Sequence, residues 1–248
     1  MSLVEFEIHG PVAVIRLNRP EFRNAVNLAV TTELRAALAR LEGDPSLHVG
    51  VLTGAGRFFC AGMDLGAFAA GERPGLNDPD HFAGFVGAQR RKTIIAAVNG
   101  GAVAGGFEMV LACDMAVAEE GAIFALPEVK RGIIAAGGGA FRLPRRLPAA
   151  IASEMLLTGD PITAERAAEL GLVNAVVPGA DVLTKALDLA ARVAANAPMA
   201  VRLTREIANA PDDWSRSDAV WAQVERSADA LEGALAFKEK RAPRWTGS

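Results

Sequence analysis

Two kinds of apolar spacing alternate along the first half of the chain, one typical of strands and the other typical of helices. Short runs that alternate at period two, or that are apolar throughout, predict strands at residues 4–8, 12–17, 49–53 and 94–98. Apolar residues at helical spacing predict helices at residues 27–41 and 82–92. Because strands and helices alternate as in βαβ units, the first half is expected to be α/β.

The second half changes character after Pro148 and becomes alanine-rich. Helical patterns cover residues 149–157, 163–169, 181–196, 198–209 and 213–241. A short strand-like segment, Leu172 to Val177, interrupts them. The apolar residues of the last helices suit either a subunit interface or an ordinary core, and both interpretations stay open at this point.

Two segments of the first half are rich in glycine or proline. Gly54 to Gly62 is predicted to be a loop, and Asp64 is expected to cap a short helix after it. The polar segment from Gly71 to Asp80 is a candidate lid.

Composition and charge narrow the class of protein. With 248 residues, 51% of them hydrophobic, the chain can bury a large core. A net charge of −3 among many charges of both signs does not favour nucleic acid as a partner. The N-terminus alternates like a strand and carries acidic residues where a secretory signal has a basic start, which indicates a cytoplasmic protein. The weakly charged stretch from Ile94 to Ala118 contains glycines, Glu108 and Asp114, so no membrane association is expected.

Several catalytic motifs are absent from the sequence. It has no G-x-S-x-G, no H-E-x-x-H and no phosphate-binding G-x-x-x-x-G-K-[ST] motif. His9, His48 and His81 show no spacing typical of ligands, so no metal is expected. Cys60 and Cys113 are expected to be buried small hydrophobes.

Glu108 is the first candidate catalytic residue. Between Ile94 and Ala118 only Glu108 and Asp114 are charged. An ionised carboxylate in apolar surroundings costs several kcal/mol unless it is paired or protonated, which favours a function for Glu108. The alternative is a carboxylate that interacts with free N–H groups at a helix start, and it does not exclude catalysis because burial raises the pKa of a carboxyl group.

A pair of backbone amides forms a candidate site for an oxygen anion. Gly105-Gly106 stands directly before a helical stretch, Phe107 to Ala112, where unpaired N–H groups are expected. The loop FFCAGMDL offers a second amide at Met63, and Gly62 allows the turn. Two such donors make an oxyanion hole, whereas the simpler interpretation of this loop is a helix-capping turn.

Glu128 in LPEVKRGI is the second candidate acid. Alone it is as easily explained as an ion-pair partner of nearby Lys130 or Arg131. Together with Glu108 it becomes a stronger catalytic candidate, because two carboxylates in different environments supply one acid and one base at neutral pH.

These segments together resemble the enoyl-CoA hydratase/isomerase (crotonase-like) superfamily, in order and through nearly the whole chain. The segments that carry the resemblance are NRPEFRNAVN, LTGAGRFFCAGMDL, AVNGGAVAGGFEMVLACDMAVA, FALPEVKRGIIAAGGGAFRLPRRL, LLTGDPITAERAAELGLVNAVV and AFKEKRAP. The resemblance implies a crotonase-like spiral of βαβ units in residues 1–190 and a helical region for trimerisation in residues 191–248. Trimers of the family often pair into hexamers.

The resemblance also assigns roles to single residues. It implies that the amides of Met63 and Gly105 hold the thioester oxygen and that Glu108 and Glu128 are the catalytic acids. It places Glu21, Phe22, Arg23 and Ala25 along the coenzyme A, and Ala61, Gly62, Asp64 and Leu65 near its adenine end. Phe237 and Lys240 match positions that reach coenzyme A from a neighbouring subunit. Where many hydratases have Pro-Gly, this chain has Ala135-Ala136, and the Ala136 amide is expected to help hold water.

The expected reaction is the addition of water across the double bond of a 2-enoyl-CoA. One glutamate activates the water and the other delivers a proton to the α-carbon, with no metal or redox cofactor and with coenzyme A only as part of the substrate. The alternatives are an enoyl-CoA isomerase, another crotonase-type acyl-CoA enzyme, or a non-catalytic acyl-CoA-binding protein. The substrate end of the pocket is expected between Phe68 and Phe85 together with Phe141.

Overall fold

The computed structural model describes residues 1–248 except 1, 76 and 211–212. Its strands are β1 (Val4–His9), β2 (Val12–Leu17), β3 (Val49–Gly54), β4 (Phe58–Cys60), β5 (Thr93–Val98), β6 (Gly101–Val103), β7 (Met115–Glu119), β8 (Ile123–Ala125), β9 (Ile162–Thr163) and β10 (Ala175–Val177). Its α-helices are α1 (Leu28–Gly43), α2 (Leu65–Ala69), α3 (Gly105–Ala112), α4 (Gly139–Arg146), α5 (Ala149–Thr158), α6 (Ala164–Glu169), α7 (Val182–Ala194), α8 (Pro198–Ala208), α9 (Trp214–Val224) and α10 (Ala228–Glu239). Four 3₁₀ helices are η1 (Pro20–Phe22), η2 (Phe82–Gly84), η3 (Pro127–Arg131) and η4 (Gly179–Asp181).

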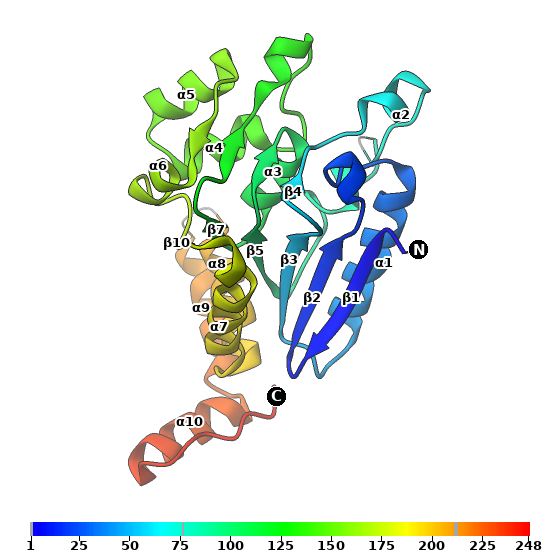
Figure 1. Ribbon diagram of the computed structural model, residues 1–248. Helices are drawn as coiled ribbons and strands as arrows, with labels where there is room; N and C mark the ends of the chain where they lie inside the picture. Colours follow the sequence, from blue (N-terminus) through cyan, green and yellow to red (C-terminus); the bar gives the residue numbers. More distant parts are fainter. Residues whose placement is uncertain (1, 76, 211–212) are drawn as a thin grey trace.

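Two sheets form the α/β part of the molecule. The larger sheet has the strand order β1-β2-β3-β5-β7-β10, in which β1 and β2 form the predicted antiparallel hairpin and the remaining pairs are parallel. The smaller sheet has the order β4-β6-β8-β9. Because β3 runs on into β4 and β5 into β6, each βαβ turn contributes to both sheets (Figure 1). The predicted α/β class is confirmed.

The central strands of the larger sheet are buried on both faces. Successive side chains of a strand point to opposite faces. Accordingly Leu52 and Ile94 pack with α1 on one face, whereas Val51 and Ile95 pack with α7 on the other. A parallel sheet covered by helices on both sides reads as a continuous apolar run, which explains why the sequence predicted β3 and β5 so closely.

Helices dominate the second half of the chain, as predicted. Most observed helices match the predicted ranges to within a few residues, and Asp64 caps α2 as expected by accepting hydrogen bonds from the Gly66 and Ala67 amides. The pattern at residues 213–241 is two helices, because the Ser227 hydroxyl accepts a hydrogen bond from the Ala230 amide and starts α10 anew. The expected boundary at residue 190 falls within α7, and the division into two regions stays a prediction.

The predicted helix at residues 82–92 is wrong. Only the 3₁₀ turn η2 forms there, and His81, Ala83 and Gly84 all have positive φ. The chain then doubles back, so that the Gly87 amide donates to the Asp80 carbonyl. Phe82, Phe85 and Val86 lie in this turn and are buried. Their spacing in the sequence is the same as that of the buried face of a helix, which led to the wrong prediction.

The candidate lid, residues 71–80, includes residue 76, which lies outside the described residues. Among the described ones, Asp78 and Asp80 form ion pairs with Arg35 of α1 at 2.7 and 3.0 Å. This part of the segment is therefore attached to α1.

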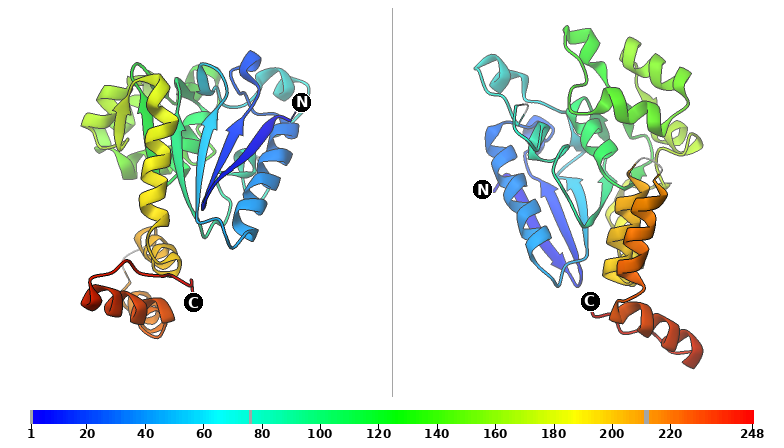
Figure 2. Two further views of the ribbon diagram at one scale, coloured as in Figure 1. Left: turned by 60° about the horizontal axis from the view of Figure 1, so that its bottom comes forward. Right: turned by 180° about the vertical axis from the view of Figure 1, so that it is seen from behind.

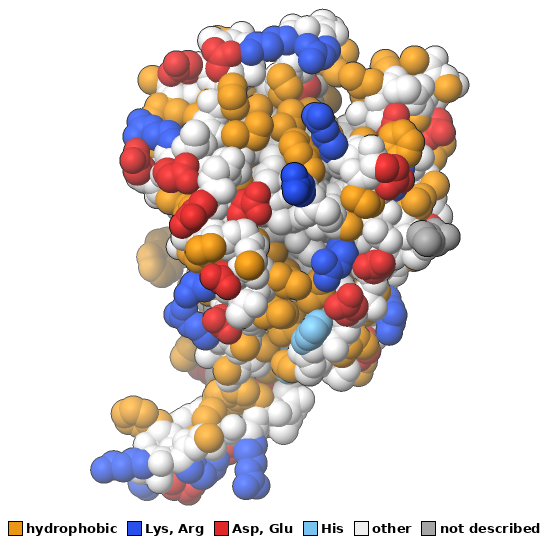
Figure 3. Space-filling view, viewed as in Figure 1, with side chains coloured by type: hydrophobic (Ala, Val, Ile, Leu, Met, Phe, Trp, Pro, Cys, Tyr) orange, Lys and Arg blue, Asp and Glu red, His pale blue; other side chains and the backbone are white. Residues whose placement is uncertain are grey.

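The C-terminal helices extend away from the sheets. Figures 1 and 2 show α10, in orange and red, projecting from the rest of the chain. Figure 3 shows acidic and basic side chains interspersed over one face, in keeping with the small net charge. No described helix combines the length and the apolar character that crossing a bilayer requires.

Candidate active site

Glu108 lies in the first turn of α3, a helix whose residues are all buried. Only 4% of Glu108 is exposed, and its Oε1 accepts a hydrogen bond of 2.9 Å from the Gly139 amide. Burial raises the pKa of Glu108 to about 7, the Gly139 hydrogen bond opposes the rise, and the negative charge of Glu128 adds to it. At neutral pH this carboxyl group is therefore close to half protonated.

The glycines at 137 and 139 permit this environment. A Cβ atom at Gly137 would lie 2.3 Å from Oε2 of Glu108, and one at Gly139 would lie 3.1 Å from Oε1. Contacts so short exclude a side chain at Gly137, so the backbone itself approaches the carboxyl group. The sequence analysis did not assign this role to the Gly137–Gly139 run, although a run of three glycines after a candidate acid was a usable signal.

The raised pKa of Glu108 predicts that Glu108→Gln stabilises the protein more at pH 8 than at pH 5. The folded state favours protonated Glu108, so this group favours folding fully below the unfolded pKa near 4.5, and that contribution is lost as pH rises through about 7. Glutamine does not ionise, so the variant does not lose stability at this position as pH rises. The variant's gain in unfolding free energy should therefore be larger at pH 8 by up to about 3 kcal/mol. Urea unfolding at both pH values measures it, and an equal gain at the two pH values contradicts the raised pKa.

Glu128 lies on η3 and is 6% exposed. Its Oε2 is buried and has no hydrogen-bond partner among the described residues. Burial raises the pKa of Glu128 above the ordinary value of a glutamate. Lys130 pairs instead with Asp160 at 2.6 Å, so the alternative of a solvated ion pair between Lys130 and Glu128 is not what the structure shows.

The loop that holds Met63 touches the start of α3, where Gly105 is the first residue. Gly62 has a φ of +88°, and a Cβ atom there would lie 2.9 Å from the Gly105 nitrogen. The Val26 amide donates to Gly62 at 2.8 Å, and the Asp64 amide donates to Val26 at 2.9 Å. This parallel bridge leaves the intervening Met63 amide facing away from Val26. Neither Met63 N–H nor Gly105 N–H has a hydrogen-bond acceptor among the described residues.

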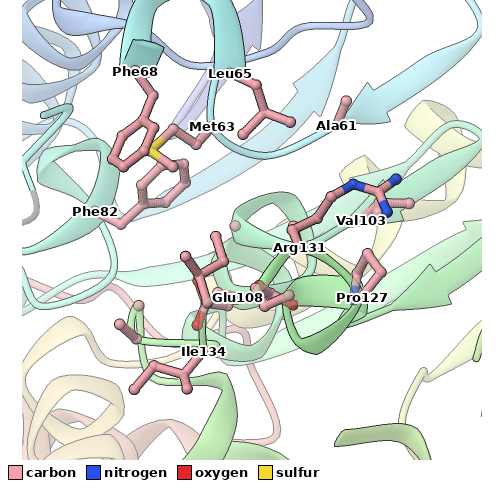
Figure 4. A pocket seen from close by; sticks show the side chains of 17 residues that line it. Ala61, Met63, Leu65, Phe68, Phe82, Val103, Glu108, Pro127, Arg131 and Ile134 are labelled. Atoms are coloured by element: carbon pink, nitrogen blue, oxygen red, sulfur yellow. The ribbon is translucent and has the colours of Figure 1, made fainter. Parts of the chain in front are cut away.

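One cavity of about 560 Å³ brings the four candidate catalytic residues together. Its lining is mostly apolar and consists of Ala61, Met63, Leu65, Phe68, Phe82, Val103, Ala104, Gly105, Glu108, Pro127, Glu128, Arg131, Gly132, Ile133, Ile134, Ala136 and Gly137. In Figure 4, Met63, Phe68 and Phe82 lie along one wall, and Glu108 with Ile134 lies along another. The arrangement offers two unpaired N–H donors beside two buried carboxyl groups, which suits proton transfer next to a developing oxyanion.

The residues expected to contact coenzyme A are only partly assembled around this cavity. Ala61, Leu65 and Ala136 line it, whereas Glu21, Phe22, Arg23, Ala25, Gly62 and Asp64 do not. The segment around Arg23 is nevertheless joined to the cavity loop, because the Ala61 amide donates to the Arg23 carbonyl at 3.0 Å. Asp64 caps α2 and pairs with Arg19 at 3.0 Å. Phe237 and Lys240 lie at α10, which extends away from the cavity (Figure 1). The roles of these residues stay predictions.

The substrate end was predicted in part. Phe68 and Phe82 line the cavity, but Phe85 is fully buried in the core and Phe141 lines a different cavity. Arg131, Ile133 and Ile134 also line the cavity and were not singled out from the sequence.

The remaining titratable candidates lie elsewhere. None of the three histidines lines the cavity. Cys60 and Cys113 are buried, as predicted, and burial raises the pKa of each thiol to about 12. Within the described ranges, no three His, Cys, Asp or Glu side chains are grouped so as to hold a metal ion.

Comparison with known proteins places the chain. Residues 7–248 match the enoyl-CoA hydratase/isomerase family. A carnitinyl-CoA dehydratase of Proteus mirabilis (strain HI4320) is 44% identical over 254 residues, covering 96% of each chain. The crystal structure of an enoyl-CoA hydratase from Mycobacterium tuberculosis H37Rv is 46% identical with a TM-score of 0.95, and that of a carnitinyl-CoA hydratase from Mycobacterium avium is 43% identical with a TM-score of 0.82. Both structures and this chain are covered over 100% of their lengths.

The chain is therefore an enzyme of the enoyl-CoA hydratase/isomerase family. The predicted superfamily and crotonase-like fold are confirmed by these matches, and the predicted hydro-lyase type agrees with the named relatives.

Proposed function

We propose that the chain catalyses the addition of water to the double bond of a 2-enoyl-CoA thioester, and the reverse dehydration. One observation carries the proposal: two buried carboxyl groups with raised pKa values, from α3 and η3, line the same apolar cavity as two unpaired backbone amides. An isolated carboxylate would be costly there, so a role in proton transfer accounts for both.

In this proposal the amides of Met63 and Gly105 hold the thioester oxygen. They stabilise the negative charge that develops on this oxygen when water attacks the β-carbon, which is worth roughly a hundredfold to a thousandfold in rate per donor. The two glutamates share the protons: one accepts a proton from the attacking water, and the other donates a proton to the α-carbon. Hydration is redox-neutral, so we propose no cofactor, and coenzyme A enters as part of the substrate.

The pKa of Glu108 supports this division of roles. A group with a pKa of about 7 gives up and takes back a proton near neutral pH with little cost in either direction. Because the charge of Glu128 raises the pKa of Glu108, the two carboxyl groups titrate as a coupled pair. A pair that holds one proton is the state that the proposed reaction needs.

The acyl group is proposed to be neutral. Besides the two glutamates, Arg131 is the charged residue among the cavity's described lining, so the lining holds no cluster of one charge that would select a charged acyl group. A carnitinyl-CoA, which carries a quaternary ammonium group, is the second candidate. The names of the relatives favour it, and so do the aromatic rings of Phe68 and Phe82, since such rings attract quaternary ammonium groups.

A panel of CoA thioesters in heavy-oxygen water tests the function. Mass spectrometry should show one labelled oxygen incorporated into crotonyl-CoA and into longer 2-enoyl-CoA thioesters, with slower labelling of the γ-trimethylammonium analogue. Double-bond migration without label assigns an isomerase instead. Preferred labelling of the cationic analogue assigns the second candidate, and tight binding without any turnover assigns a non-catalytic acyl-CoA-binding protein.

The C-terminal region is proposed to complete the site of a neighbouring subunit. Phe237 is 87% exposed on α10, an unusual fraction for a phenylalanine. A cytoplasmic trimer or dimer of trimers, in which Phe237 and Lys240 reach a neighbour's coenzyme A, accounts for that exposure. Arg23 and Lys240 are the proposed phosphate partners.

A further inference from the structure

A second cavity, of about 790 Å³, lies between the loop before β5, the end of α3, α4 and the end of α8. It shares no lining residue with the candidate active site. Five arginines line it together with a single carboxylate, that of Asp114; the arginines are Arg90, Arg142, Arg145, Arg146 and Arg205. This concentration of one sign of charge contrasts with the mixed charges of the surface in Figure 3.

The one carboxylate is already engaged. Asp114 Oδ1 accepts from Arg205 Nε at 2.7 Å, and Asp114 Oδ2 accepts from the Ile94 amide at 2.9 Å. Arg205 in turn donates to the Arg90 carbonyl at 2.8 Å. Asp114 therefore balances Arg205 and leaves the other four guanidinium groups without a carboxylate among the cavity's described residues.

Arg90 is the residue that most needs a partner. Its Nη2 donates to the Ala112 carbonyl, while Nε and Nη1 are buried and have no acceptor among the described residues. Burial lowers the pKa of Arg90 and Arg205 adds to this, whereas the charges of Asp114 and Glu42 oppose it. A buried donor of a charged group that lacks an acceptor destabilises the folded state.

Arg142 and Arg146, both on α4, also donate to uncharged acceptors. Arg142 donates to the Val86 carbonyl at 2.6 Å and to the Gly137 carbonyl at 3.0 Å. Arg146 donates to the Cys113 carbonyl at 2.8 Å. These neutral acceptors fix the guanidinium groups in place but do not neutralise their charge, so the cavity holds several preoriented cationic donors.

We propose that this arginine-lined cavity is an anion-binding site, separate from the active site, for a small ligand that carries phosphate or carboxylate groups. Planar guanidinium groups bind such oxygens in pairs, and α4 alone brings three of them, Arg142, Arg145 and Arg146, to the cavity lining. The large volume suits an anion with several oxygens better than a single chloride ion.

A ligand in this cavity would also affect the surroundings of Glu108 in the candidate active site. Arg142 reaches from the cavity to the Gly137 carbonyl, and Gly137 is the glycine against which Glu108 packs. An anion bound to Arg142 therefore supports the turn that holds the proposed catalytic acid.

Titration calorimetry of the full chain tests the site, with inorganic phosphate and citrate as probes and sodium chloride at equal ionic strength as reference. Phosphate or citrate should bind saturably and raise the melting temperature. Arg145→Gln removes an exposed member of the cluster and should weaken binding by about tenfold, the effect of about 1.4 kcal/mol. Arg90→Gln should weaken it further. The control Arg192→Gln removes the same charge from α7, outside the cavity, and should bind as the wild type does.

The two probes separate phosphate from carboxylate as the preferred group. The proposal is overturned if the wild type binds neither probe saturably, or if Arg145→Gln binds both with unchanged affinity. A third result also overturns it: Arg145→Gln lowers the molecular mass of the assembly in analytical ultracentrifugation, and phosphate leaves the melting temperature of the wild type unchanged. The cavity would then be a contact between subunits.

Discussion

Replacing Glu108 or Glu128 by glutamine is expected to lower kcat for the hydration of crotonyl-CoA by roughly a hundredfold to ten-thousandfold in each case. Glutamine has nearly the same shape but neither accepts a proton from water nor donates one to carbon. Both side chains are at most 6% exposed and line the same cavity, so bulk solvent cannot readily replace the missing proton carrier. Stopped-flow or steady-state assays at pH 7 measure the loss.

The matched control is Glu120→Gln, which makes the same change at an exposed carboxylate and should leave kcat unchanged. Circular dichroism should show that all three variants are folded. If only one of the two cavity variants loses hydration, the two-acid mechanism is wrong, and a single-acid reaction such as isomerisation becomes the better interpretation. If neither loses it, the cavity is not the active site.

Gly62→Ala is expected to lower kcat/KM by roughly a hundredfold to a thousandfold without touching either acid. The new Cβ atom would lie 2.9 Å from both the Ala104 Cβ and the Gly105 nitrogen. The Met63 loop and the start of α3 must therefore separate, which would part the two amides that are proposed to hold one oxygen. Kinetics with crotonyl-CoA and binding of an unreactive acyl-CoA measure the effect.

Gly121→Ala separates this effect from simple backbone strain. Gly121 has a φ of +75°, similar to the +88° of Gly62, but nothing lies within 4 Å of its Cβ position. Both alanine variants should lose about 1 to 2 kcal/mol of stability from the left-handed backbone, whereas only Gly62→Ala should lose activity. Wild-type kcat/KM in a folded Gly62→Ala variant would show that the contact between the Met63 loop and the start of α3 is not needed for catalysis.

The strands that carry the site were predictable because they are buried on both faces. β3 and β5 are buried at every position, and apart from Thr53, Thr93 and two glycines their residues are apolar. The segment 82–92 failed for the opposite reason: its apolar residues meet the core from a turn with positive φ angles, and Ala83 gives no local sign of such a backbone. Spacing alone does not separate the two cases.

Glu108 was predictable as a candidate from its isolation in apolar sequence, and Glu128 only through its pairing with Glu108 and the family resemblance, but the surroundings of both were not predictable. The contact of Gly137 with Glu108 joins residues far apart in the chain, and the sequence shows only that glycines are present. The arginine-lined cavity likewise depends on packing, since Arg90, Arg142 and Arg205 come from three separate segments that each look like ordinary charged surface. Long-range packing of this kind leaves no periodic trace.

The helix α3 carries both Gly105 and Glu108 within one turn. The proposed holder of the oxyanion and the proposed proton carrier therefore belong to a single rigid rod, and no small tilt of that rod displaces one without the other. Mutational losses along it should consequently combine by less than their product, as they do for groups that act as one cooperative unit. Substitutions that adapt the cavity to a new acyl substrate are then best tolerated at Phe68 and Phe82, on the opposite wall of the cavity. Side chains there can change without moving α3.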